Sequence, residues 1–154
     1  MNASVAIQTL PEAKNDEELI RIVDEVSLEG TQKKYPSELS GGMRQRAALL
    51  RTYMFSNSVA LLDEPFSAID ALTKSEIHSW YLDVMERIKL STLFITHDID
   101  EAILLSDRIY LMSGKPGRIT KEIVIEGKTP RSSKFTLTDK FLEYKRMITH
   151  ELKT

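Results

Sequence analysis

The sequence predicts an α/β domain built on a mainly parallel sheet with crossover helices. Three short apolar blocks, at 59–62, 92–96 and 108–112, have the composition of buried strands, and segments with helical spacing separate them. Strands that alternate with helices pair in parallel through crossover connections. The length of 154 residues suits one compact domain with its own core.

The helical segments begin in the first third of the chain, which is expected to be largely α-helical. Residues 15–30 start with a capping Asn, carry acids in the first turn, place their apolar residues on one face and end at a Gly. Residues 35–38 are typical of a loop. The Ala- and Leu-rich run 42–55 predicts a second helix, so that Gly41 and Gly42 lie at its start.

The apolar block Val59–Leu62 opens the α/β core as a buried strand. It ends in Asp63 and Glu64, and Pro65 then breaks it. The elements expected next are a helix at 71–89, a strand at 92–96, a short helix at 98–106 and a strand at 108–112.

The last part of the chain is expected to add an edge strand and a terminal helix. A turn at 113–117 precedes a strand at 118–125, and a polar stretch leads to a helix at about 139–152. The predicted division is 1–55 as part of a helical subdomain, 56–127 as the α/β core, and 128–154 as a linker and helix.

The composition excludes several functional classes. The chain is 42% hydrophobic and 29% charged, as in folded soluble proteins, and 21 basic against 23 acidic residues leave a net charge of −2. No overall charge would therefore hold the chain on nucleic acid or an anionic membrane. The absence of cysteine excludes thiolate chemistry and fits a reducing compartment. With no signal peptide and no apolar run long enough to span a bilayer, the expected location is the cytoplasm.

A candidate phosphate site lies at the start of the second helix. Ser40, Gly41 and Gly42 place a hydroxyl and two small residues where unpaired N–H groups and the helix dipole attract anions. Read alone, the same residues also fit an ordinary serine cap.

Polar residues also follow two of the predicted strands. Asp63 and Glu64 lie at a carboxyl strand end, where open α/β sheets bind ligands, and such a pair can hold Mg²⁺ and orient an attacking water. His97 follows the next strand and can hydrogen-bond a phosphate. The alternatives are a solvated acid pair and a capping or surface histidine.

Taken together, these residues resemble the ATP-binding subunit of an ABC transporter, which implies part of a P-loop NTPase fold. Four motifs occur in the order of that family: 39–46 is similar to its signature motif, 59–65 to its Walker B strand, 67–70 to its D-loop, and His97 to its switch histidine. Residues 106–119 further resemble the importer branch that serves nitrate, sulfonate, taurine and related solutes.

The resemblance implies a role for each of these residues. Glu64 would be the general base, His97 would sense the γ-phosphate, and Asp63 would help hold Mg²⁺. Asp70 would link the two sites of a dimer. Gln45 would belong to the nucleotide-binding signature, in which Ser40, Gly41 and Gly42 would touch the γ-phosphate of an ATP held by a second subunit. The implied partners are that second ATP-binding subunit, a transmembrane permease and, indirectly, a solute-binding protein. The implied location is the inner face of the cell membrane, with no nucleic acid involved.

One part of the family pattern is missing. No stretch reads Gly-x-x-x-x-Gly-Lys-[Ser/Thr], the loop that cradles ATP phosphates, and residues 2–6 resemble the segment after the family's glutamine loop. The sequence therefore looks like the carboxyl-terminal part of such a subunit, and the isolated chain is expected to be inactive. Two hypotheses remain open: an importer ATPase subunit represented by this part, and a truncated, catalytically incompetent paralogue that acts only as a binding module.

Overall fold

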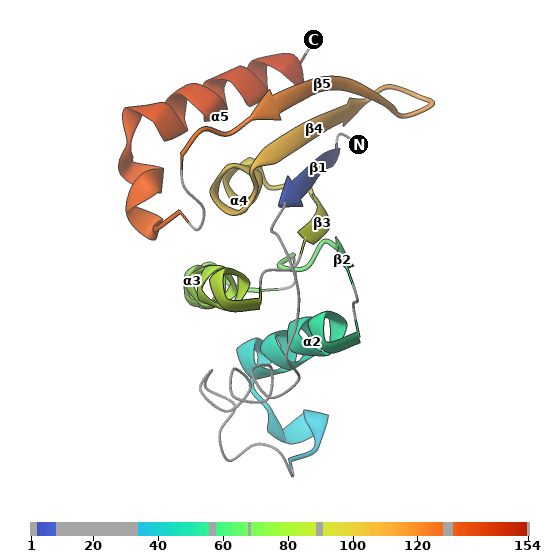
Figure 1. The fold of residues 1–154 in the computed structure, drawn as a ribbon, viewed down its shortest axis with the longest axis vertical. Coiled ribbons are helices and arrows are strands. Elements are labelled where there is room, and N and C mark those ends of the chain that lie inside the picture. The colour runs from blue at the N-terminus through green and yellow to red at the C-terminus, as the bar shows by residue number, and fades with distance from the viewer. Residues whose placement is uncertain are drawn as a thin grey trace.

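The computed structural model describes residues 3–8, 34–55, 58–67, 69–88, 91–127 and 131–153 (Figure 1). Its elements in chain order are β1 (Ala3–Gln8), η1 (Pro36–Glu38), α2 (Gly41–Phe55), β2 (Val59–Asp63), α3 (Ala71–Ile88), β3 (Ser91–Thr96), α4 (Ile99–Leu105), β4 (Arg108–Ser113), β5 (Arg118–Val124), η2 (Ser133–Leu137) and α5 (Asp139–Glu151). The helix predicted at 15–30 lies outside the described residues. The strands and helices predicted from residue 42 onward all have counterparts.

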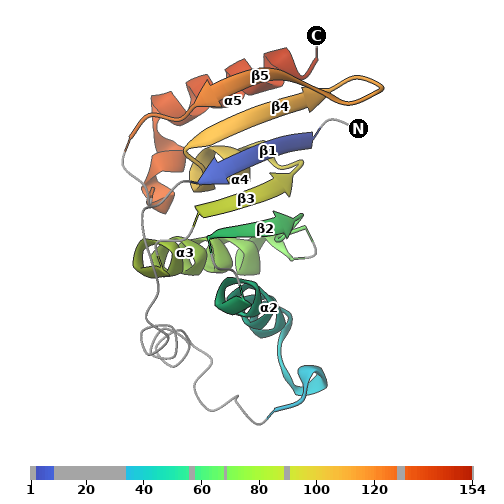
Figure 2. The same cartoon turned by 45° about the vertical axis from the view of Figure 1, so that its right-hand side comes forward.

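The strands form one sheet in the order β2-β3-β1-β4-β5 (Figure 2). β2 and β3 pair in parallel, with Asp63 opposite Ile95, and β1 is antiparallel to both β3 and β4. The three core strands β2, β3 and β4 therefore share one direction, as the intervening helices α3 and α4 predict. The α/β class is confirmed, and β5 adds the expected antiparallel edge.

The strand β1 was not predicted. It lies between β3 and β4, with Val5 in register with Ile95 on one side and with Tyr110 on the other. The sequence analysis placed residues 1–55 in a partial helical subdomain, whereas the structure places Ala3–Gln8 in the sheet. The physical reason is backbone pairing: an extended segment in this position satisfies the N–H and C=O groups along the facing edges of β3 and β4. The division of the chain into three parts stays a prediction.

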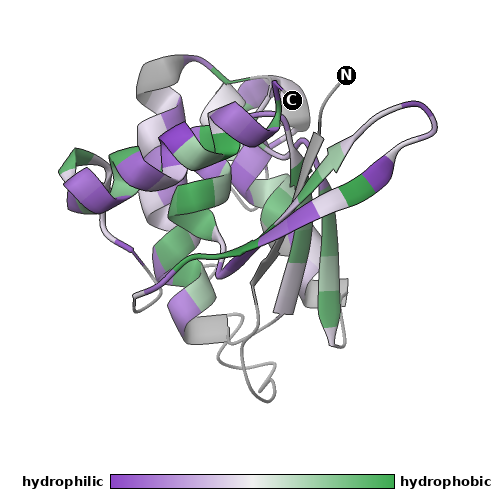
Figure 3. Ribbon diagram, turned by 90° about the horizontal axis from the view of Figure 1, so that it is seen from above, coloured by the Kyte–Doolittle hydropathy of each residue, from purple (hydrophilic) through white to green (hydrophobic). Residues whose placement is uncertain are grey.

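The helices gather on one side of the sheet, as Figure 3 shows, where the molecule is seen from above and the sheet on edge. Two clusters of buried side chains fill the space between them: one joins α2 and α3 to β2 and β3, and the other joins α4 and α5 to β4 and β5. Within β2 the burial alternates, so that Ala60 and Leu62 face the helices.

On the opposite face of the sheet, the part formed by β2 and β3 is open and apolar, whereas β4 and β5 carry the exposed ion pair of Arg108 with Glu122. The exposed fractions of Val59, Leu61 and Ile95 are 49%, 68% and 37%. Parallel strands rich in aliphatic residues are normally covered on both faces, so this surface is unusual for such a sheet. None of the helices in the described part of the chain is long and apolar enough to cross a membrane.

Candidate functional site

The candidate site begins at the turn that follows β2. The backbone N–H of Glu64 donates to the carbonyl of Ile95 at 2.8 Å, which continues the pairing of β2 with β3 by one residue. Glu64 then adopts a φ of 47°. A left-handed conformation costs a non-glycine residue about 1–2 kcal/mol, and such strain is concentrated at functional sites. Ser67 stabilises the turn, because its hydroxyl donates to the carbonyl of Glu64 at 3.0 Å.

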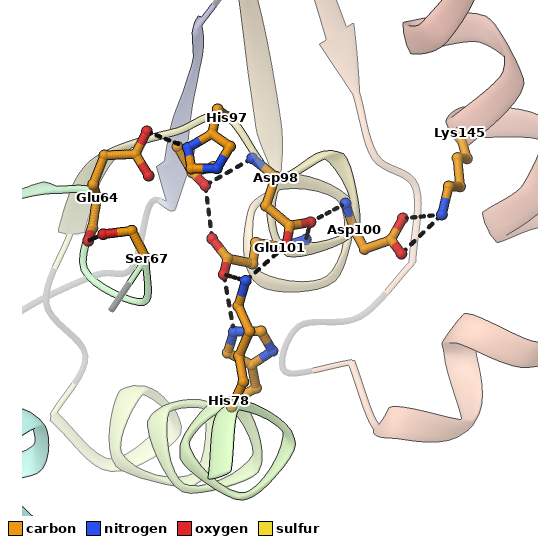
Figure 4. A network of polar contacts seen from close by, with 10 residues as sticks. Glu64, Ser67, His78, His97, Asp98, Asp100, Glu101 and Lys145 are labelled. Atoms are coloured by element: carbon orange, nitrogen blue, oxygen red, sulfur yellow. Dashed lines mark hydrogen bonds and ion pairs between the residues drawn. The ribbon is translucent and has the colours of Figure 1, made fainter. Parts of the chain in front are cut away.

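This turn brings Glu64 to His97. The Nδ1 atom of His97 lies 2.7 Å from the Oε1 atom of Glu64 (Figure 4). The two residues follow adjacent parallel strands, so their side chains meet at the carboxyl edge of the sheet. Both are accessible, with side-chain exposures of 68% for His97 and 33% for Glu64. The hydrogen bond that the His97 ring donates to Glu64, and the negative charge of that carboxylate, raise the pKa of His97 above its ordinary value.

Asp63 lies at the end of β2 with its side chain exposed. Within the described residues its carboxylate makes no hydrogen bond and no ion pair, and no group of three or more His, Asp or Glu there could hold a metal ion by itself. A carboxylate at this edge that has no partner among the described residues fits Mg²⁺, which proteins usually bind through one or two carboxylates, with water and substrate phosphates as the other ligands.

The signature residues begin α2. Ser40 caps the helix, because its Oγ accepts from the N–H of Met43 at 3.2 Å. A Cβ atom placed on Gly41 would meet nothing within 4 Å, whereas one on Gly42 would lie 3.1 Å from the side-chain methyl of Thr73. Gly41 therefore leaves the backbone open at the helix start, and Gly42 allows close packing of α2 on α3.

Gln45 and Asp70 make contacts within the protein that were not foreseen. The side-chain amide of Gln45 donates to the carbonyl of Pro65, which ties α2 to the turn after Glu64. Asp70 caps α3, because its Oδ1 accepts from the N–H of Thr73 at 3.1 Å. The structure thus brings Glu64 and His97 together directly and packs α2 against the turn and the start of α3. The functional roles of all these residues stay predictions.

Sequence reasoning missed a buried polar cluster behind His97. Its members are Glu101, which is only 2% exposed, and the partners of its carboxylate, Thr96, Lys74 and His78. The one local signal in the sequence is that Glu101, in the first turn of α4, is followed by four apolar residues at 102–105.

Comparison with known proteins supports the motif assignment. The family model for the ABC transporter matches residues 2–67. The aliphatic sulfonates import ATP-binding protein SsuB of Bacillus cereus is 52% identical over 108 residues, which cover 70% of this chain and 42% of the relative. An uncharacterized ABC transporter ATP-binding protein of Methanocaldococcus jannaschii is 36% identical over 147 residues, covering 96% of this chain and 54% of the relative.

A solved structure extends the likeness to three dimensions. It is a dimeric ATP-binding cassette in a post-hydrolysis state bound to ADP and Pi, with a TM-score of 0.52, 26% sequence identity, and coverage of 77% of this chain and 51% of the other. The chain thus spans about half the length of the curated relatives it matches. Both the sequence relatives and the shared fold lead to one conclusion: the chain belongs to the ABC transporter ATP-binding family.

Proposed function

We propose that this chain is the carboxyl-terminal part of the ATP-hydrolysing subunit of an importer for small sulfonate-like solutes. The observation that carries the proposal is the 2.7 Å contact between Glu64 and His97 at the carboxyl edge of the sheet. The solute class rests on the relative from Bacillus cereus, whose name describes import of aliphatic sulfonates.

The two residues of this contact suit different tasks. Glu64 keeps a carboxylate that is one-third exposed and can accept a proton from an attacking water. His97 uses Nδ1 toward Glu64, which leaves Nε2 to donate to a phosphate oxygen. Because Glu64 favours the protonated imidazole, His97 would also carry positive charge toward the phosphate.

The remaining site residues would hold the nucleotide. Asp63 would bind Mg²⁺, the ion that neutralises charge on the transferring phosphoryl group. Ser40, Gly41 and Gly42 would offer the start of α2 to the γ-phosphate of an ATP held by a second subunit, since free N–H groups at a helix start bind anions. Gln45 would keep α2 next to the catalytic turn, and Asp70 would connect the two sites of the dimer.

The assembly would follow from these roles. The proposed partners are a second ATP-binding subunit, a transmembrane permease and, indirectly, a solute-binding protein, at the inner face of the cell membrane. The near balance of charge, at −2, favours protein partners over nucleic acid.

A chimaera tests the proposal. The amino-terminal part of the Bacillus cereus relative would be joined to this chain, and phosphate release from Mg-ATP would be measured. We expect Mg²⁺-dependent hydrolysis that is lost in the Ser40→Arg variant, because a bulky side chain blocks the signature surface, and no hydrolysis by residues 1–154 alone. A folded chimaera that binds ATP without turnover, beside an active full-length relative, would contradict the proposal and favour the binding module.

A further inference from the structure

The buried carboxylate of Glu101 connects the functional segments on the helix side of the sheet. Its Oε2 accepts from the hydroxyl of Thr96 at 2.7 Å, and its Oε1 lies 2.5 Å from Nζ of Lys74 and 3.5 Å from Nε2 of His78. Thr96 ends β3, whereas Lys74 and His78 lie one turn apart on α3. One carboxylate therefore joins β3, α3 and its own helix α4 (Figure 4).

The cluster holds the chain on both sides of His97. On one side, the Thr96 hydroxyl donates to Glu101 and accepts from the N–H of Asp98 at 3.0 Å. On the other, Oδ2 of Asp98 lies 2.7 Å from Nζ of Lys74, and its Oδ1 caps α4. His97 lies between two anchored neighbours, while its own side chain is 68% exposed.

The same cluster also contacts the segments that carry Glu64 and Asp70. The ring of His78 packs edge-on against Phe66, at a centroid distance of 4.8 Å, and Phe66 belongs to the turn that begins at Glu64. Lys74 lies in the first turn of α3, where its N–H donates to the carbonyl of Asp70 at 2.8 Å. Glu101 is thus linked through its partners to the segments that carry His97, Glu64 and Asp70.

We propose that Glu101 is a positioning residue: through Thr96 and Lys74 it fixes the loop that carries His97 and so sets the contact between His97 and Glu64. A loop with one exposed side chain and no anchor would sample many positions, and small displacements of a catalytic group lower rates strongly. The effect on the His97 contact is a property of this chain alone. The consequence for ATP hydrolysis rests on the function proposed above.

The direct test is the pKa of His97, measured by NMR titration of residues 1–154. The Glu64→Gln variant gives the pKa of His97 in the absence of the Glu64 carboxylate, and this pKa should be lower than that in the wild type. Thr96→Val removes the bridging hydroxyl without changing any charge. If Glu101 positions the loop through Thr96, this variant should lower the pKa of His97 by at least half of the change produced by Glu64→Gln.

Lys74→Met separates positioning from simple electrostatics. Removal of a nearby cation would by itself raise the pKa of His97, whereas release of the loop would lower it. We therefore expect a decrease in the pKa of His97. If Thr96→Val does not fold, the Lys74→Met variant alone tests the proposal. The titratable groups of the cluster are Glu101, Lys74 and His78. Asp98 faces the cluster through Lys74, and Glu64 faces His97.

The matched control is Thr149→Val, which removes a threonine hydroxyl that bonds within α5, away from the cluster. It should leave the pKa of His97 unchanged even if it lowers stability. An unchanged pKa of His97 in a folded Thr96→Val protein, or an increase in Lys74→Met, would overturn the proposal.

Kinetics on the chimaera supply the second readout. Glu101→Gln should lower kcat about 10- to 100-fold and leave the KM for ATP within about twofold, because the positioning of His97 and Glu64 affects the chemical step more than binding. An equal loss of kcat in Thr149→Val would indicate a general loss of structure and contradict this role. An inactive wild-type chimaera would overturn the proposed function, while the His97 titration would still decide whether Glu101 positions the loop.

Discussion

Replacing Lys74 by Met should destabilise the protein at neutral pH and do so less in acid. The substitution keeps the aliphatic length of the side chain but removes the cation 2.5 Å from the buried Glu101 carboxylate. Loss of one partner of a fully buried ion pair costs about 3–5 kcal/mol. Because the Lys74 side chain is 23% exposed and Thr96 still donates to Glu101, we expect a smaller loss of about 1–3 kcal/mol in the free energy of unfolding.

The dependence on pH follows from the direction of two pKa shifts. Burial alone would raise the pKa of Glu101, but hydrogen bonds from His78, Lys74 and Thr96 outweigh it and lower the pKa below its ordinary value. Burial alone would lower the pKa of Lys74, but its bonds to Asp98 and Glu101 raise it. The ion pair therefore stabilises the fold fully between pH values of about 4.3 and 10.4, the ordinary pKa values of a glutamate and a lysine. Its stabilisation is lost as the pH falls through the lowered pKa of Glu101.

Urea unfolding followed by the fluorescence of Trp80, the single tryptophan, measures both effects. The control is Lys145→Met, which removes the cation of an exposed pair with Asp100, where side-chain exposures are 44% and 50%. It should cost less than about 0.5 kcal/mol. A loss in Lys74→Met no larger than in Lys145→Met, or a loss that does not shrink between pH values of about 7 and 3, would show that the pair of Lys74 and Glu101 does not stabilise the fold in this way.

Three further predictions concern packing, the open sheet face and nucleotide binding. Gly42→Val should lower the free energy of unfolding by about 1–3 kcal/mol, since its Cβ would press on Thr73, whereas Gly41→Val should change it by no more than about 0.5 kcal/mol in the same urea assay. The apolar face formed by β2 and β3 should lead to self-association, which Leu61→Ser should reduce in sedimentation with little effect on stability, because Leu61 is 68% exposed. Leu62→Ser, at an 8% exposed position, should instead destabilise the fold by several kcal/mol, and equal effects of the two variants would contradict the open face. Residues 1–154 should show no submillimolar affinity for Mg-ATP in calorimetry, because the Gly-x-x-x-x-Gly-Lys loop is absent from the sequence, and a stoichiometric site of that affinity would disprove this.

Local patterns explain why most elements could be predicted. The apolar blocks that became β2 and β3 end in polar residues, and the helix α4 begins at Ile99, directly after the capping residue Asp98. The contact between Glu64 and His97 follows from this pattern as well, because adjacent parallel strands bring their carboxyl ends to one edge of the sheet.

The features that were missed depend on contacts between distant parts of the chain. β1 is short and its place between β3 and β4 is decided by pairing with residues near 95 and 110, which no local pattern encodes. The role of Gly42 also depends on a neighbour, since only the approach of Thr73 shows that this glycine serves helix packing. Likewise, a glutamate in the first turn of a helix is common at the surface, and only the packing of α3 against α4 shows that Glu101 is buried.

The proposed role of Glu64 as the base, in a site completed by His97, can be tested with one variant of the chimaera. Glu64→Gln keeps the size of the side chain but cannot accept a proton from water. We predict that this variant binds Mg-ATP and elutes as an ATP-dependent dimer on gel filtration, with phosphate release reduced by at least about 100-fold. Phosphate release near the rate of the unmodified chimaera would show that Glu64 is not the base.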